Sequence, residues 1–203
     1  MGENSGRIEF YFDFSSPYGY LGAQRIDELA ASVGRDALWQ PFLLGAVYKK
    51  TGAEPLVNVP LKKEYSAIDM PRSARKLGVP FVFPQDFPMA TVPACRAFYW
   101  LEREDAEQAR TLAKALYHAA FADGRNISAA ESVLEVAGEQ GFDTQAMEAA
   151  LGDQEIKDLT REKVEQAIEK GVFGSPFLIV DGEPFWGHDR MEEAMEWART
   201  GGW

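Results

Sequence analysis

The sequence predicts an α/β fold in which one mixed sheet is built from both ends of the chain and a block of helices is inserted between them. Three observations support this. A strand–helix–strand pattern opens the chain, strand signals return only near the C-terminus, and the long stretch between them is mostly periodic in the manner of helices. A chain of 203 residues suits one domain with an insertion, or two small ones.

The N-terminal pattern begins with an alternating, aromatic-rich strand over residues 7–14 and continues as a helix over residues 17–33. Ser16 followed by Pro17 is typical of a helix start, with an N-cap residue and then proline at the first helical position. A second strand is predicted over residues 37–44. This spacing predicts a βαβ unit with parallel strands and a right-handed crossover.

The central part predicts a long loop followed by consecutive helices. The loop, residues 45–60, is rich in glycine, proline and small residues, and long loops in compact domains are often functional. Ser128 and Glu131 form a capping-box pattern, and prolines exclude a helix from residues 78–88. The predicted helices cover residues 61–77, 94–103, 104–122, 128–141, 143–151 and 153–170. Because this block is too long for a crossover, we expect an inserted helical domain, 61–170, within a discontinuous domain formed by 1–60 and 171–203.

The C-terminal part predicts a hairpin and a closing helix. Residues 177–180 and 183–186 are short strands joined by the turn signal Asp181–Gly182, and Pro184 confines the second strand to a sheet edge. Residues 189–199 form an amphipathic helix. Two strands from each half, joined in one mixed sheet, give a thioredoxin-like layout with an inserted all-helical domain.

Composition excludes several classes of partner. The formal net charge of −11, with no basic stripe, argues against nucleic acid and against an anionic membrane surface. An apolar run of about 18 residues, the length a membrane span needs, is absent. The first residues lack the apolar core of a signal peptide, so we expect a cytoplasmic protein.

Few side chains suit metal or disulfide chemistry. Cys95 is the one cysteine, so an intrachain disulfide is impossible, and we expect it to be a small core residue. The two histidines, His118 and His188, lack zinc-type spacing, so no metal site is expected. We expect His118 to be structural, near the apolar side of its helix.

Ser16 is the candidate functional residue. A strand that ends at a helix start leaves unpaired N–H groups and positive dipole density beside Ser16, which favours an anion such as a thiolate. The alternative is that Ser16 only caps the helix. In a thioredoxin-like arrangement the redox Cys-x-x-Cys motif stands here, facing a proline before the third strand. This chain has Ser16, Pro17, Tyr18 and Gly19 instead, so thiol–disulfide exchange is excluded and the sulfur must come from elsewhere, for example from a tripeptide thiol.

Five segments together resemble a known family. They run in the family's order and spacing over nearly the whole chain, at residues 12–18, 41–45, 78–81, 171–176 and 185–190. By these segments the chain resembles the 2-hydroxychromene-2-carboxylate isomerases and the closely similar kappa-class glutathione transferases, both relatives of DsbA.

The resemblance implies glutathione as the cofactor and a homodimer. It implies that the Ser16 hydroxyl donates to the glutathione sulfur, and that Ser175 offers main-chain groups to the tripeptide beside a cis-proline, Pro176. It places Asp189 and Arg190, next to His188, at the γ-glutamyl end, and Lys62 at the glycyl end. Many relatives have a Gly–Asn pair where this chain has Gly52–Ala53. A polar contact of that asparagine with glutathione or substrate is therefore missing here, unless Asn58 replaces it. Gly19 and His188 also depart, since relatives often have serine at each position.

The reaction that the resemblance implies is isomerisation of an unsaturated aromatic α-keto acid. Lys62 or Lys63 would hold its carboxylate, although the cations of helix 61–77 could equally form a solvated face. The candidates for an aromatic pocket wall, each of which could instead be a core residue, are Tyr18, Phe42, Phe81 and Trp186.

Three other functions stay open. A glutathione transferase would consume glutathione, whereas an isomerase conserves it. A non-catalytic thioredoxin-like protein could use the Ser175–Pro176 edge to bind peptides. A serine hydrolase would need a histidine base for Ser16, and His188 is the arguable candidate.

Overall fold

The computed structural model describes residues 6–84 and 86–203 and contains a four-stranded mixed sheet in the order β2-β1-β3-β4. The strands are β1 (Arg7–Phe12), β2 (Asp36–Pro41), β3 (Phe177–Val180) and β4 (Glu183–Trp186). β1 runs parallel to β2 and antiparallel to β3, and β4 is the antiparallel edge strand beside β3. The predicted thioredoxin-like α/β fold, with its sheet drawn from both ends of the chain, is confirmed.

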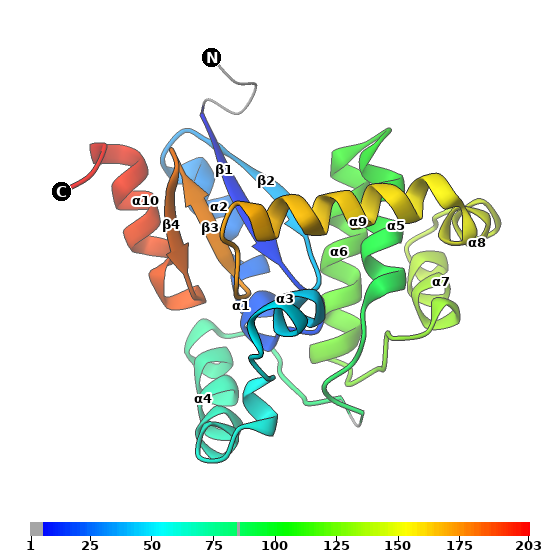
Figure 1. The fold of residues 1–203 in the computed structure, drawn as a ribbon, viewed down its shortest axis with the longest axis horizontal. Coiled ribbons are helices and arrows are strands. Elements are labelled where there is room, and N and C mark those ends of the chain that lie inside the picture. The colour runs from blue at the N-terminus through cyan, green and yellow to red at the C-terminus, as the bar shows by residue number, and fades with distance from the viewer. Residues whose placement is uncertain (1–5, 85) are drawn as a thin grey trace.

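The helices surround this sheet and extend beyond it (Figure 1). They are α1 (Pro17–Ala23), α2 (Ile26–Ser32), α3 (Leu44–Thr51), α4 (Lys62–Leu77), α5 (Val92–Glu102), α6 (Ala106–Phe121), α7 (Ala130–Glu139), α8 (Thr144–Gly152), α9 (Gln154–Glu169) and α10 (Met191–Thr200), with the short 3-10 helices η1 (Leu56–Asn58) and η2 (His188–Arg190). In Figure 1, α5–α8 lie together beside the sheet, α4 lies below it, and α9 runs back toward β3. The division into two domains stays a prediction.

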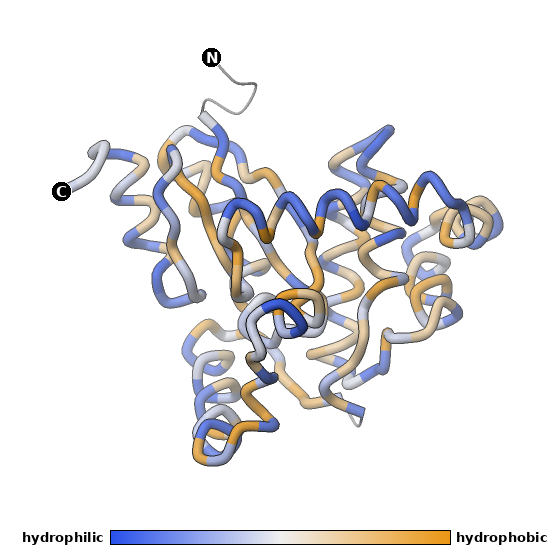
Figure 2. Tube along the Cα trace, viewed as in Figure 1, coloured by the Kyte–Doolittle hydropathy of each residue, from blue (hydrophilic) through white to orange (hydrophobic). Residues whose placement is uncertain are grey.

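The alternation of β1 divides the hydrophobic core into two clusters. Ile8, Phe10 and Phe12 point into the larger cluster, which also contains residues of α5–α8 and α10. Tyr11 points to the opposite face, where a smaller cluster joins it to Phe177 and to residues of α3 and α9. Figure 2 shows the corresponding pattern, with hydrophobic residues along the strands and α9 alternating between hydrophilic and hydrophobic along its length.

The single helix predicted over residues 17–33 is wrong, because the chain forms α1 and α2 with a break at Gln24 and Arg25. Gly19 and Gly22 make α1 a weak helix by composition. Both glycines are needed for packing, and at Gly22 an added β-carbon would be 3.1 Å from the ring of Pro176. The first helix is therefore seven residues long.

The second strand and the following loop also differ from the prediction. The strand predicted over residues 37–44 ends at Pro41, and the predicted loop 45–60 contains α3 and η1. The N–H of Leu44, in the first turn of α3, donates to the carboxylate of Asp13 at 2.6 Å. This cap comes from residues distant in sequence, so local composition could not indicate it.

Smaller differences concern the ends of elements. The first strand ends at Phe12 and the closing helix begins at Met191, after η2. The capping box is wrong: α7 begins after Ala129 without a side-chain cap, and the Ser128 N–H donates to the Asn126 side chain. The hairpin strands are confirmed at their predicted bounds.

Candidate functional site

Ser16 occupies the N-cap of α1, as the sequence predicts, and it also contacts the loop before β3. Its hydroxyl accepts a hydrogen bond from the Gly19 N–H at 3.0 Å, which satisfies one of the unpaired donors of the helix start. The same hydroxyl donates to the main-chain carbonyl of Ser175 at 2.9 Å. Ser16 is buried, so these two partners define where its oxygen lies.

The loop opposite Ser16 contains the cis peptide bond between Ser175 and Pro176. The Pro176 carbonyl accepts from the Gly187 N–H at 3.0 Å, which ties the loop to the end of β4. The Ser175 hydroxyl accepts from the Asp13 N–H at 2.9 Å. Ser16, Ser175 and Pro176, three predicted site residues from opposite ends of the chain, thus lie together.

Asp13 is a buried residue that the sequence analysis did not single out. Its carboxylate accepts from the Ser15 N–H and the Thr91 hydroxyl at 2.8 Å each, and from the Leu44 N–H. Burial raises the pKa of Asp13 above its usual value, while these hydrogen bonds act in the opposite direction. The signal available in the sequence was one charge at the end of an aromatic strand, which also fits a turn residue.

Tyr18 and His188 are brought together beside α1. Their rings stack with centroids 5.3 Å apart, and the Tyr18 hydroxyl donates to Asp69 of α4 at 2.7 Å. Burial, followed by the contact with Asp69, raises the pKa of Tyr18. Burial lowers the pKa of His188, which favours its neutral form. Asp69 also accepts from Arg72 and Tyr65, so α4 is attached to α1 through this carboxylate.

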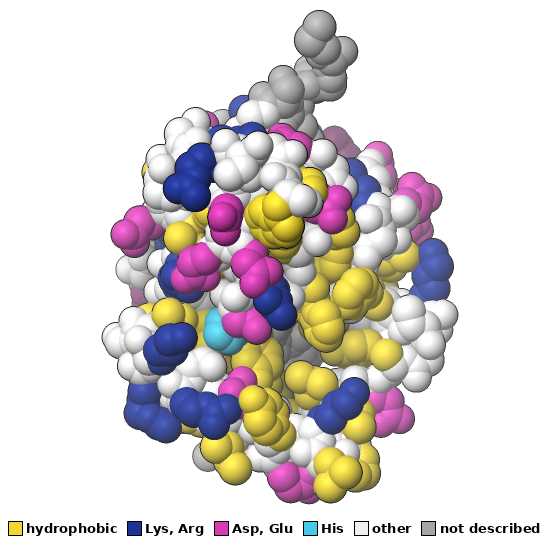
Figure 3. Space-filling model, turned by 90° about the vertical axis from the view of Figure 1, so that its left-hand side faces the viewer, with side chains coloured by type: hydrophobic (Ala, Val, Ile, Leu, Met, Phe, Trp, Pro, Cys, Tyr) yellow, Lys and Arg dark blue, Asp and Glu magenta, His cyan; other side chains and the backbone are white. Residues whose placement is uncertain are grey.

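The predicted charged ligands are exposed. Lys62 and Lys63 lie in the first turn of α4, and among the described residues neither forms an ion pair. Asp189 and Arg190 lie in η2, and Arg190 pairs with Glu193. Figure 3 shows the face that carries α4, with Lys and Arg side chains gathered in its lower part and hydrophobic side chains bordering a hollow near its centre.

The predicted aromatic wall residues differ in exposure, and their role in binding a substrate stays a prediction. Phe42 is fully buried in the smaller core cluster, which agrees with the core role that the sequence left open as its alternative. Trp186 is 55% exposed and lies against Gly174, where an added β-carbon would overlap the indole ring. Phe173, which the sequence analysis did not assign, contacts Trp186 with ring centroids 5.0 Å apart.

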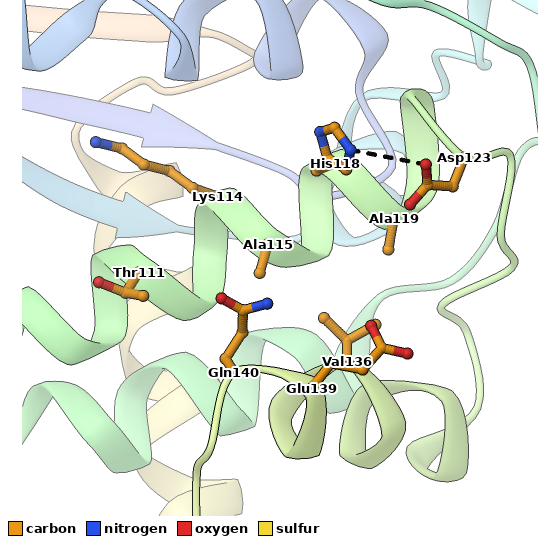
Figure 4. A pocket seen from close by; sticks show the side chains of 9 residues that line it. All are labelled: Thr111, Lys114, Ala115, His118, Ala119, Asp123, Val136, Glu139 and Gln140. Carbon is orange, nitrogen blue, oxygen red and sulfur yellow. Dashed lines mark ion pairs between the residues drawn. The ribbon is translucent and has the colours of Figure 1, made fainter.

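A cavity of about 360 Å³ lies elsewhere, between α6 and α7 (Figure 4). His118 lines it and is exposed, with Nε2 3.6 Å from the carboxylate of Asp123, so its expected place on the apolar side of α6 is wrong. The cavity contains none of the predicted site residues. Over the described part of the chain, residues 6–84 and 86–203, no group of three metal-binding side chains occurs, and no helix is long and apolar enough to cross a membrane.

Comparison with known proteins identifies the family. The model of the DSBA-like thioredoxin domain matches residues 7–196. The chain belongs to the DsbA-like thioredoxin family. Within this family it is 30% identical to 2-hydroxychromene-2-carboxylate isomerase of Pseudomonas putida, covering 93% of each protein. It is 26% identical to glutathione S-transferase kappa 2 of Caenorhabditis elegans, covering 93% of this chain and 90% of the relative.

A solved structure agrees with these sequence relatives. A 2-hydroxychromene-2-carboxylate isomerase matches with a TM-score of 0.83 and 29% identity, over 94% of both chains. The predicted resemblance to the isomerases and the kappa-class transferases is therefore confirmed, and the protein is a member of a group of enzymes.

Proposed function

We propose that the protein is a glutathione-dependent isomerase of an unsaturated aromatic α-keto acid, of the 2-hydroxychromene-2-carboxylate isomerase type. The observation that carries the proposal is the hydroxyl of Ser16, held at the start of α1 against the cis-proline loop. This is where a DsbA-type oxidoreductase has its reactive cysteine. The one thiol of the chain, Cys95, is buried in α5 and burial raises its pKa, so it does not replace that cysteine.

The residues present fit glutathione in charge and polarity. Ser16 and the main chain of Ser175 beside Pro176 offer polar groups to the cysteinyl part. The exposed Lys62 would contact the glycyl carboxylate. His188, Asp189 and Arg190, next to one another in η2, would contact the γ-glutamyl end. Tyr18, Lys63 and Trp186 are the proposed substrate contacts.

When bound, glutathione would supply a thiolate for reversible addition to the substrate double bond, which would allow rotation about the carbon–carbon bond and would return glutathione unchanged. A free thiol has a pKa of about 8.5, so only a few per cent is ionised at neutral pH. The Ser16 hydroxyl can turn from the Ser175 carbonyl and donate to the sulfur, and a hydrogen bond to a charged group contributes about 1.5–3 kcal/mol. One pKa unit corresponds to about 1.4 kcal/mol, so this bond alone can lower the thiol pKa by one to two units. Lys63 would hold the substrate carboxylate during rotation.

The test is turnover of the Ser16→Ala variant with an aromatic α-keto acid and glutathione. We expect turnover to fall about 10²-fold with the fold intact, because one donor to a developing anion contributes about that much. Ser15→Ala is the matched control, since among the described residues the Ser15 hydroxyl forms no hydrogen bond. Equal turnover in both variants would contradict the role of Ser16.

A kappa-type transferase is the second candidate, and the relatives of that class support it. Counting glutathione during turnover separates the two, because a transferase consumes it in proportion to product. Thermal stabilisation by reduced glutathione, compared with its S-methyl analogue, tests cofactor use separately from turnover. The homodimer and the cytosolic location stay predictions, the former to be checked by light scattering.

A further inference from the structure

Two buried hydroxyls fill the space where residue 19 would have a side chain. A β-carbon added to Gly19 would overlap the hydroxyl oxygen of Tyr117 and would be 2.7 Å from that of Ser175. Tyr117 comes from α6, in the helical block, and is completely buried. A glycine at position 19 therefore lets a side chain from the helical block reach the start of α1.

The Tyr117 hydroxyl binds the main-chain carbonyl that also binds Ser16. It donates to the main-chain carbonyl of Asp13 at 2.8 Å, and that same carbonyl accepts from the Ser16 N–H, also at 2.8 Å. Asp13 in turn donates its N–H to the hydroxyl of Ser175 at 2.9 Å, and the Ser175 carbonyl accepts from the Ser16 hydroxyl. The phenol thus binds Asp13, the residue whose main chain contacts both Ser16 and the cis-proline loop.

We propose that Tyr117 is a positioning residue, which fixes the group at position 16 against the cis-proline loop and requires glycine at position 19. The proposal goes beyond the proposed function, because it concerns the orientation of residue 16 whether or not glutathione is the ligand.

Tyr99 provides a matched control for a purely structural role. It is also fully buried, it also comes from the helical block, on α5, and its hydroxyl donates to the main-chain carbonyl of Pro41 at 2.5 Å. That carbonyl lies at the end of β2, and among the described residues Tyr99 forms no hydrogen bond with residue 16 or with the cis-proline loop. Tyr99→Phe therefore removes a similar bond from the same core without touching the site.

The reporter is a thiol introduced by Ser16→Cys, whose pKa is measured from the pH dependence of alkylation by iodoacetamide. Cys95 is fully buried, so it reacts slowly in the folded protein. The other titratable groups near Tyr117 and Asp13 are Tyr48 and Cys95, and the variants compared leave these groups and Asp13 unchanged. No glutathione is present, so failure of the proposed function leaves this test intact.

In the Ser16→Cys background, Tyr117→Phe should raise the pKa of the introduced thiol by about half a unit or more, which lowers the alkylation rate at pH 7 about threefold. Without the Tyr117 hydroxyl, the partial negative charge of the Asp13 carbonyl oxygen is less compensated, which disfavours a nearby thiolate. The chain at the start of α1 also loses one of its hydrogen bonds to the helical block. Tyr99→Phe should leave this pKa unchanged. Equal shifts in the two variants, or no shift in either, would overturn the proposal.

The glycine requirement is tested by unfolding in urea. Gly19→Ala should destabilise the protein strongly when Tyr117 is present and clearly less in the Tyr117→Phe variant, because the overlapping oxygen is gone. The same loss in both backgrounds would overturn the glycine requirement. Should Tyr117→Phe fail to fold, Ser175→Ala removes the other hydroxyl of the pair and should raise the thiol pKa in the same direction; an unchanged pKa there would overturn the proposal.

Discussion

Substitution of Asp13 changes a carboxylate that links the end of β1 to α3 and to the start of α5. In Asp13→Ala, the Ser15 and Leu44 N–H groups and the Thr91 hydroxyl lose their acceptor, and each unsatisfied donor costs about 1–3 kcal/mol when buried. Two of these three bonds are only partly buried, so water can replace some of the loss. We therefore expect the free energy of unfolding to fall by about 3–4 kcal/mol.

Asp13→Asn separates charge from hydrogen bonding. Its remaining oxygen can keep the bonds from Ser15 and Thr91, which share one carboxylate oxygen, but its amide nitrogen would face the N–H of Leu44. We expect a loss of about 1–2 kcal/mol, from one missing acceptor and one opposed donor pair.

The pH dependence of stability tests the role of Asp13 more directly than the size of the loss at one pH. Because burial raises the pKa of Asp13 in the folded protein, its contribution to stability is greatest below the unfolded pKa of about 4 and is lost as the pH rises through the folded value. The difference in the free energy of unfolding between the wild type and Asp13→Asn should therefore shrink from pH 4 upward. The contributions of the other carboxyl groups cancel in this difference, because both proteins contain them. Urea unfolding at a series of pH values measures it. An advantage that grows with pH would mean that the three hydrogen bonds outweigh burial, and would refute this reasoning.

Further predictions concern packing and capping. Gly174→Ala should destabilise the protein by about 2 kcal/mol or more, because the added methyl group would overlap the Trp186 indole. Gly45→Ala should stabilise it by up to about 1 kcal/mol, because Gly45 lies within α3 with open space around it. Urea unfolding compares the two variants, and equal effects would contradict the packing argument. Asp143→Ala should cost about 1 kcal/mol, because the Asp143 carboxylate accepts from the Ala146 N–H at the start of α8; an unchanged melting temperature would show that the cap contributes nothing.

Much of the fold could be predicted because local patterns and long-range packing agree there. The hairpin of β3 and β4 was predicted at its bounds from an apolar run and the Asp181–Gly182 turn signal. The helices predicted over residues 143–151 and 153–170 are α8 and α9, and the structure shows that Asp143 and Asp153 cap them. In each case the residues that determine the element are its own neighbours.

The structure differs from the prediction where a residue distant in sequence determines how a segment folds. α3 begins because the carboxylate of Asp13 binds the Leu44 N–H, and no composition of residues 45–60 indicates that. The Ser16–Ser175 pair was accessible through the resemblance to a family, since local pattern alone supports a simple helix cap equally well. Tyr117 could not be found from sequence, because an inward-facing tyrosine of an amphipathic helix looks like any core residue.

The packing around Phe12 has a consequence for how the chain melts. This ring of β1 contacts Phe98 of α5 and Tyr117 of α6, so strand and helices lose their shared interior together. Calorimetry should record a single heat-absorption peak whose integrated enthalpy matches the van't Hoff value. A fragment containing only the helices would leave an aromatic surface uncovered, and we expect it to aggregate when it is expressed without the sheet.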